Sequence, residues 1–127
     1  MRSLIIQIPI NTKLVSSNSI YAGTSHYKRR QYKDNISREV CPALLKYAKR
    51  DINRQVRLTW CFHVKSQKLF DASNYGYTAK IIEDLLVGVI IPNDNSKWVL
   101  ASNILAPIRL NKWNPNECIC KIEVDYE

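Results

Sequence analysis

Residues that can bind a metal ion gather in one stretch, residues 70–99, of this 127-residue chain. The stretch holds Asp71, Asp84 and Asp94, together with Lys80. Carboxylate oxygens are the ligands that Mg²⁺ prefers. A bound Mg²⁺ can activate water and stabilise the charge that builds up when a phosphodiester bond is cleaved. In a basic chain, these carboxylates predict a metal ion held against nucleic acid.

The same residues also have an ordinary structural interpretation. Asp71 can lie near the start of a helix, and Asp94 falls in 92–95, whose sequence Pro-Asn-Asp-Asn is typical of a turn. Lys80 and Asp84 are spaced so that they can form a simple ion pair on the surface of a helix. On this interpretation the chain is an RNA-binding or protein-binding domain whose acidic residues serve as caps and turns.

The basic side chains are concentrated in the first part of the chain, whose formal net charge is +8 overall. Residues 1–50 carry ten basic and two acidic side chains, whereas residues 51–127 carry nine of each. The densest basic cluster, with two tyrosines interleaved, consists of Tyr27, Lys28, Arg29, Arg30, Tyr32 and Lys33. Cations and rings together suit phosphates and stacked bases, and they equally suit a solvated helix face. A polyanion is expected to meet this first half.

The expected elements alternate between strands and helices. Alternating apolar residues predict strands over 3–10, 55–65, 97–106 and 118–126, with a short further strand at 108–110. The length of the chain predicts a single domain over residues 1–127. The fold class is therefore α+β: one compact domain in which a mixed β-sheet of about four strands is covered by two main helices.

Two helices are expected to position the chemistry. The first covers 25–50, with Thr24 or Ser25 as its cap, and Pro42 should kink or split it. The second should begin at Ser73 or Asn74, either of which can cap it, and run to about residue 87. Gly88 marks its end. On this second helix, Asn74, Lys80 and Asp84 are spaced to share one polar edge.

Several classes of protein are disfavoured by the sequence. No apolar run approaches the roughly 18 residues of a membrane span, and the short apolar start lacks a signal-peptide cleavage site, so a cytoplasmic protein is expected.

Cys118 and Cys120 should share one strand face, as buried free thiols or, alternatively, as metal ligands with a histidine. His63 is either a polar-face residue of its strand or a site residue near the carboxylates.

The pattern of the stretch 71–99 resembles the RusA family of Holliday junction resolvases, in particular its small phage-borne members. The family pattern has an Asp-x-Asp-Asn start, then a Lys and an Asp four residues apart, an apolar run and an acidic pair. The corresponding residues here are Asp71, Ser73 and Asn74, then Lys80 and Asp84, then Asn93 and Asp94. Asn18, His26 and the pair Arg29-Arg30 resemble the family's N-terminal Asn and basic helix.

This resemblance implies a homodimeric endodeoxyribonuclease that depends on Mg²⁺, for which Mn²⁺ can substitute, and that nicks four-way DNA junctions symmetrically in recombination and repair. Asp71 and Asp94 would be metal ligands, Asp84 an additional carboxylate and Lys80 the active-site lysine. DNA would contact Asn18, His26, Lys28, Arg29, Arg30 and Lys33. The resemblance also implies a phage or prophage protein that acts in the cytoplasm of a bacterial host.

The sequence departs from the family pattern at two positions. Ser73 stands where the family has its second Asp, and Asn93 stands where the late acidic pair begins. Each departure replaces an anionic oxygen with a neutral one, so that Ser73, Asn74 and Asn93 are expected beside the ligands rather than among them. The lost charge should lower Mg²⁺ affinity. The alternative function is therefore a RusA-like module that binds branched DNA, or another partner, without cleaving it.

Overall fold

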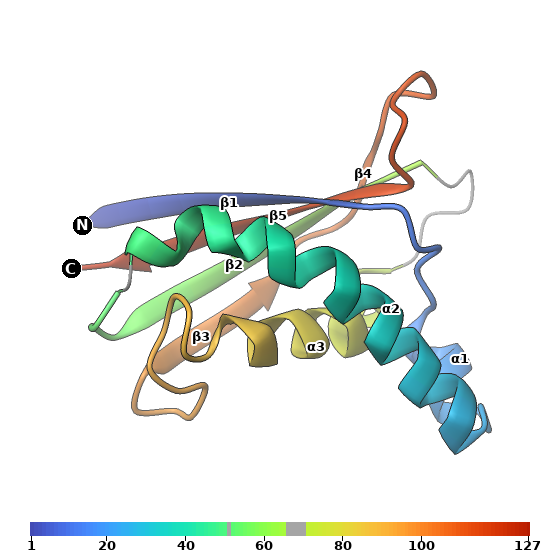
Figure 1. The fold of residues 1–127 in the computed structure, drawn as a ribbon, viewed down its shortest axis with the longest axis horizontal. Coiled ribbons are helices and arrows are strands. Elements are labelled where there is room, and N and C mark those ends of the chain that lie inside the picture. The colour runs from blue at the N-terminus through green and yellow to red at the C-terminus, as the bar shows by residue number, and fades with distance from the viewer. Residues whose placement is uncertain (51, 66–70) are drawn as a thin grey trace.

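A five-stranded mixed sheet forms the frame of the molecule in the computed structural model, which describes residues 1–50, 52–65 and 71–127 (Figure 1). The strands are β1 (Arg2–Ile10), β2 (Val56–Val64), β3 (Val99–Ile104), β4 (Ile108–Arg109) and β5 (Cys118–Tyr126). Their order is β1-β5-β2-β3, with β4 also paired to β2. β5 is antiparallel to both β1 and β2, whereas β3 and β4 are parallel to β2. The predicted α+β class with a mixed sheet is confirmed.

Alternation of side chains gives the sheet one apolar face. In β2, Leu58, Trp60 and Phe62 are fully buried, while Thr59 and His63 on the other face are half-buried. Helices lie against the apolar face, and the opposite face lacks such a cover (Figure 1). Apolar residues on one side only are what an antiparallel sheet covered on one face requires.

The edge position of β1 explains Pro9. The amide of Gln7 donates to the Tyr47 hydroxyl rather than to β5, at 3.3 Å. Backbone groups alternate between the two sides of a strand, so Pro9, two residues on, directs its missing N–H to the same outer edge. Pro9 therefore costs the sheet no hydrogen bond.

Two main helices cover the sheet, and one short helix precedes them. They are α1 (Ser17–Tyr21), α2 (His26–Leu44) and α3 (Gly76–Leu86), with 3₁₀ turns η1 (Leu45–Arg50) and η2 (Ala72–Tyr75). Figure 1 shows α2 and α3 on the same side of the sheet. The sequence did not predict α1, which Ser16 caps by accepting from the amide of Ser19 at 3.2 Å.

The helix boundaries correct two expectations, the end of α2 and the cap of α3. Ser25 does cap α2, accepting from the amide of Lys28 at 3.2 Å, but α2 ends at Leu44 and continues only as a 3₁₀ turn. Pro42 lies inside its last turn, where a missing N–H removes one helical hydrogen bond. Ser73 and Asn74 do not cap α3, because they lie within η2. Gly88, with φ +82°, follows the end of α3 as expected.

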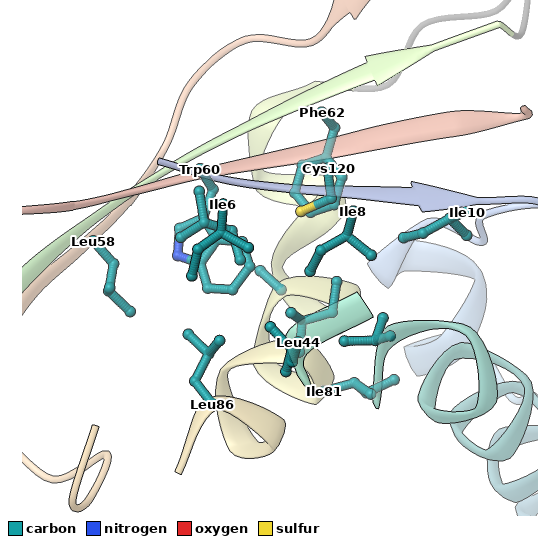
Figure 2. Packing of buried hydrophobic residues seen from close by; sticks show 14 of the residues in the cluster. Ile6, Ile8, Ile10, Leu44, Leu58, Trp60, Phe62, Ile81, Leu86 and Cys120 are labelled. Carbon is teal, nitrogen blue, oxygen red and sulfur yellow. The ribbon is translucent and has the colours of Figure 1, made fainter. Parts of the chain in front are cut away.

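The core fills the space between the sheet and the two helices. Figure 2 shows Leu58, Trp60 and Phe62 of β2 directed toward Leu44 of α2 and Ile81 of α3. Removing a large buried side chain of this kind costs about 3–5 kcal/mol. The rigid frame below the functional residues is therefore the product of ordinary apolar packing.

The cysteines divide into two groups. Cys118 and Cys120 are fully buried on the core face of β5, as expected of structural thiols, and burial raises the pKa of Cys118 to about 12. Cys61 is buried on the opposite face of the sheet, whereas Cys41 is exposed on α2. The predicted burial of Cys118 and Cys120 as free thiols is thus confirmed. Within the described ranges, no helix is long and apolar enough to cross a bilayer.

Candidate functional site

Lys80 lies at the centre of an ionic cluster on α3. Its Nζ is 2.9 Å from Oδ2 of Asp94 and 3.1 Å from Oδ1 of Asp84. Asp84 is one helical turn further along α3, whereas Asp94 comes from the turn that follows the helix. The structure therefore brings together Lys80, Asp84 and Asp94, which the sequence had placed within one stretch.

A third carboxylate in this cluster was not predicted. Glu83 Oε2 lies 3.8 Å from the Lys80 ammonium, and the Glu83 side chain is only 11% exposed. The spacing of three residues from Lys80 to Glu83 was the signal in the sequence. It was overlooked because Glu83 falls among the apolar residues that face the core. We refer to Lys80, Glu83, Asp84 and Asp94 as the Lys80 cluster.

The Lys80 cluster fixes the charge of two of its members. Hydrogen bonds from the ammonium to Asp94 and then Asp84 raise the pKa of Lys80 well above its usual range. The pKa of Asp94 is lowered, chiefly because Lys80 donates to it. At neutral pH, Lys80 is therefore a cation and Asp94 an anion. Lys80 can neutralise a phosphate in this state, but it cannot accept a proton from water.

Asp71 lies apart from the Lys80 cluster in the structure. It immediately precedes η2, it is exposed, and its carboxylate makes no capping hydrogen bond. Its backbone carbonyl accepts from the amide of Asn74 at 2.9 Å. Ser73 is also exposed and Asn74 is half-buried. The carboxylate of Asp71 is thus available to a ligand at the start of the helix that carries Lys80.

Ser17 connects α1 to this helix start. Its hydroxyl donates to the carbonyl of Asn74 at 3.1 Å and accepts from the amide of Tyr77 at 3.0 Å. Asn18, the next residue, is exposed on α1. The resemblance had singled out Asn18, but the residue that links α1 to α3 in the structure is Ser17. Nothing in the spacing of the sequence indicated this long-range contact.

Asn93 belongs to the turn that presents Asp94. Its side-chain Oδ1 accepts from the amide of Asn95 at 3.2 Å, and Asn95 Oδ1 accepts in turn from the amide of Lys97 at 3.0 Å. Such local bonds between side chain and backbone are how Asn stabilises turns. Asn93 therefore holds the loop of Asp94 in shape and uses its amide oxygen to do so.

A basic groove lies at the N-terminal end of α2. It has a volume of about 480 Å³, and its lining consists of His26, Arg29, Arg30, Lys33, Asp34 and Tyr77. Three cations thus face a single carboxylate. Their spacing along α2 puts them on one side of the helix. Lys28, which was predicted with them, is exposed but lies outside this lining.

Arg29 has a structural contact as well as a place in the groove. Its Nη2 donates to the carbonyl of Ile20 at 2.9 Å and so ties α1 to α2. Its Nε is buried and makes no hydrogen bond to any residue in the described part of the chain. Arg30 and Lys33 are exposed. These two are the groove cations best placed to meet an anion in solution.

Tyr77 joins the basic groove to the Lys80 cluster. Tyr77 lines the groove, and Lys80 follows it by three residues on α3, which puts both on the same side of the helix. One helical turn corresponds to about 5.4 Å along the axis. The groove and the Lys80 cluster are therefore neighbours on one surface.

The two tyrosines near the basic turn have different environments. Tyr32 is buried: its ring stacks on Tyr77 with centroids 6.2 Å apart, and its hydroxyl is 2.6 Å from that of Thr78. Burial raises the pKa of Tyr32 to about 12. Tyr27 is 74% exposed. Of the two, Tyr27 is thus the ring that can meet a base, while Tyr32 fixes α2 against α3.

A magnesium site can be tested against these positions by the chemistry of the donors. Among the described residues, no three His, Cys, Asp or Glu side chains are grouped to hold a metal ion by themselves. Mg²⁺, however, is usually held by one or two carboxylates plus substrate phosphates and water. The Lys80 cluster has three carboxylates against one ammonium, so its donor type and its excess negative charge suit this ion.

His63 is not one of the neighbours of Lys80. It lies on the face of the sheet opposite the helices, where it lines a hollow of about 230 Å³ with Cys61, Leu105 and Lys121 among others. The polar-face interpretation of His63 therefore agrees with its position.

Comparison with known proteins gives no match, either to a protein-family model or to a curated sequence.

Proposed function

We propose that this chain is a Mg²⁺-dependent, structure-selective endodeoxyribonuclease that resolves four-way DNA junctions by paired, symmetric nicks. The observation that carries the proposal is that Tyr77, which lines the basic groove, precedes Lys80 of the Lys80 cluster by three residues, or about one helical turn, on α3. Cations that bind a polyphosphate next to carboxylates that can hold Mg²⁺ are what hydrolysis of a DNA strand requires. The resemblance to RusA resolvases supports the same function.

The groove would hold the DNA backbone. Arg30 and Lys33 are exposed and would contact phosphates, with His26 beside them. Contacts of this kind position the backbone and do not read its sequence. Binding should therefore weaken steeply as the salt concentration rises, because each neutralised phosphate releases condensed counterions.

Lys80 would act as a cation that responds to the substrate. A phosphate that enters from the groove offers the ammonium a second anionic partner besides Asp84 and Asp94. When Lys80 turns to that phosphate, it neutralises part of the charge and leaves the two carboxylates with unshared oxygens. Asp94, an anion at neutral pH, would then be ready to bind a cation.

Asp84 and Asp94 of the Lys80 cluster would hold Mg²⁺, whereas Asp71 lies apart from that cluster and would not join them on one ion. The chemistry that the ion supplies when bound is activation of water and stabilisation of negative charge on the cleaved phosphate. Ser73 and Asn74 would lie beside Asp71. Asn93 would hold the turn of Asp94, as its bond to the amide of Asn95 indicates.

Paired nicks require two sites related by symmetry. A homodimer is the simplest such arrangement, and two-fold dimers are by far the commonest oligomers. We propose this state for the chain, together with a cytoplasmic location in a bacterial host of a phage or prophage. Both follow from the resemblance.

A second candidate function is a module that binds branched DNA without cutting it. The observation that favours it is the environment of Ser73 and Asn93, the two positions that depart from the family pattern. Ser73 is exposed and neutral, and the amide oxygen of Asn93 already accepts a hydrogen bond in its turn. Neither supplies the anionic oxygen that the family pattern has there, and Mg²⁺ affinity falls with ligand charge.

Labelled DNA separates these functions. The protein is incubated with a four-way junction and with a matched linear duplex, in the presence of Mg²⁺, Mn²⁺ or chelator. Paired nicks in the junction alone that require metal would support the resolvase. Tight junction binding without a cut would support the module, and equal treatment of both DNAs would contradict junction selectivity.

Charge variants test the groove in the same experiment. Arg30→Gln with Lys33→Gln removes two groove cations, whereas Arg38→Gln with Lys46→Gln removes two exposed cations outside the groove. The first pair should weaken junction binding and lower the salt dependence by roughly one phosphate contact per residue. Equal losses for both pairs would mean that only net charge matters and that the groove has no special role.

A further inference from the structure

The most exposed aromatic ring of the described residues is Trp113, in the loop between β4 and β5. Its exposure is 80%, whereas Trp60 is fully buried and Trp98 is half-buried. We define residues 110–117 as the Trp113 loop. Figure 1 shows this loop projecting beyond the sheet, away from α2 and α3. A single exposed apolar ring is common on protein surfaces, so a binding role of Trp113 depends on the contacts that this ring and its loop make.

The Trp113 loop is held in a defined shape. Asn111 Oδ1 accepts from the amide of Trp113 at 2.9 Å, and Asn114 Oδ1 accepts from the amide of Asn116 at 2.9 Å. Lys65 fastens the loop to β2, since its Nζ donates to the carbonyl of Asn114 at 2.7 Å. The indole is therefore presented by a backbone that is already ordered, which lowers the entropy cost of binding.

A cation contacts this ring. Lys112 Nζ lies 5.1 Å from the Trp113 ring centroid, in a cation–π contact. Lys97 and Trp98, which precede β3 and lie outside the Trp113 loop, make the same kind of contact at 5.7 Å. Between Asp94 and Glu117 the sequence carries Lys97, Arg109 and Lys112 and no acidic residue. A polyanion suits such a segment, whereas a second copy of this chain, with its net charge of +8, suits it less.

We propose that the Trp113 loop is a second nucleic-acid contact, in which the Trp113 indole stacks on an unpaired base and Lys112 meets the neighbouring phosphate. This inference rests on the proposed DNA-binding function. Stacking needs an open base face, which single strands and branch points offer and an intact duplex does not. The loop would therefore add a preference for DNA with unpaired bases to the backbone contacts of the groove.

The loop is close enough to Asp71 for one DNA to reach both. The loop is anchored at Lys65, and only residues 66–70 separate Lys65 from Asp71 in the chain. Even a fully extended connection of that length spans at most about 20 Å. This distance corresponds to about six nucleotides of a DNA strand. A DNA strand that runs from Asp71 toward Lys65 therefore reaches the base of the loop within about six nucleotides.

The test measures binding of the full chain to three probes: a single-stranded oligothymidylate, a closed hairpin duplex and a four-way junction. Trp113→Ala should weaken binding to the oligothymidylate by about 5- to 150-fold, the usual effect of losing one stacked ring. Hairpin binding should change little. Trp113→Phe, which retains a ring, should keep most of the affinity for all three probes.

Fluorescence gives an independent readout of the same contact. Stacking on a base should quench the emission of the wild-type protein when oligothymidylate is added, and Trp113→Phe should lose that quenching while it still binds. Because Trp113 is exposed, neither variant should change the thermal midpoint. Unchanged oligothymidylate binding by Trp113→Ala would overturn the inference, as would quenching that survives in Trp113→Phe.

The outcomes also separate this inference from the proposed function. If Arg30→Gln with Lys33→Gln abolishes binding while Trp113→Ala binds normally, the inference about the Trp113 loop is refuted and DNA binding by the groove is supported. If only Trp113→Ala loses binding, DNA binding by the Trp113 loop is supported and DNA binding by the groove is refuted. A wild-type chain that binds no DNA refutes both. A lower mass of Trp113→Ala in sedimentation, without loss of oligothymidylate binding, would assign the ring to self-association and refute the inference.

Discussion

The two sides of α3 differ in how they use polar groups. On the side toward α2, the fully buried hydroxyl of Thr78 is paired with that of Tyr32. On the other side, Lys80 is largely exposed and binds carboxylates across short distances. The first side uses neutral groups in a dry seam, and the second uses full charges in water.

This difference indicates which side carries stability and which carries function. A buried polar group without a partner costs about 1–3 kcal/mol, so the seam must remain paired. Exposed ion pairs contribute only about 0–1 kcal/mol, so the Lys80 cluster is a weak structural device. Charges that contribute little to folding, but that gather beside a basic groove, are more simply explained by ligand binding. Three substitutions test this contrast.

The largest effect is expected from Asp94→Asn. It removes an anion from the Lys80 cluster, so cleavage of a four-way junction should fall by on the order of 100-fold or more. Junction binding and the free energy of unfolding should stay close to those of the wild type, because Asp94 belongs to the Lys80 cluster, whose ion pairs contribute little to stability. Gel assays of binding and of nicking, with urea unfolding, measure all three.

Glu127→Gln is the matched control for this change, since it removes one exposed carboxylate elsewhere in the chain. It should cleave as the wild type does. An Asp94→Asn protein that nicks the junction at the normal rate would show that the Lys80 cluster is not the active centre. One that unfolds much more easily would show that the cluster is structural.

An intermediate effect is expected from Tyr32→Phe in the seam. Loss of the Tyr32 hydroxyl leaves Thr78 buried without this partner, at a cost of about 1–3 kcal/mol at pH 7. The pKa of Tyr32 is raised to about 12 in the folded state, against about 10 when unfolded. Wild-type stability from this group is thus present below pH 10 and declines toward pH 12, as the unfolded state ionises first.

The gap in unfolding free energy between wild type and Tyr32→Phe should therefore narrow by about 2 kcal/mol between pH 10 and pH 11.5. Urea unfolding across this range measures it. Tyr27→Phe, a change at an exposed tyrosine of the same helix, should leave the unfolding free energy unchanged at pH 7. A gap that stays constant with pH would mean that Tyr32 is not held neutral in the seam.

The smallest effect on stability is expected from Lys80→Met. Because the Lys80 side chain is 59% exposed, the unfolding free energy should change by no more than about 1 kcal/mol. The pKa of Asp94 should rise, since its main donor is gone. In the wild type the Asp94 contribution is present above an ordinary Asp pKa of about 3.9 and is lost as the pH falls through the lowered value.

An NMR titration of the Asp94 carboxyl measures this shift, with Lys46→Met as the control for loss of an exposed lysine. An Asp94 pKa that stays low in Lys80→Met would mean that Lys80 is not its main partner. A large loss of stability would erase the contrast between the two sides of α3, because the exposed charges would then hold the fold.

Local patterns predicted the elements well. The alternation in 55–65 identified β2, and Ser25 was correctly identified as one of two alternative caps of α2. Short elements were predicted less well: α1 is too brief for a periodic signal, and η2 took the place of the expected cap at Ser73 or Asn74. One turn of helix contains too few residues for its apolar spacing to be recognised.

The candidate site was likewise predicted where its contacts are local and missed where they are not. Lys80 and Asp84 were predicted to share an edge because helical spacing is a local property, and they do. The contact of Asp94 with Lys80 depends on how the loop after Gly88 returns, and Glu83, which the sequence did not single out, contacts Lys80 from among residues that face the core. Loop paths and the partners of a buried carboxylate depend on the whole fold.

By itself, the sequence determined the basic first half, the strand and helix pattern, and the presence of carboxylates near one lysine. Charge and periodicity depend only on residue type and on spacing along the chain. Only the tertiary structure decided that α2 and α3 lie side by side, with Tyr77 between the groove and Lys80. It also decided that Trp113 lies in solvent. The physical reason is that these placements follow from packing around one shared core, which couples residues far apart in the chain.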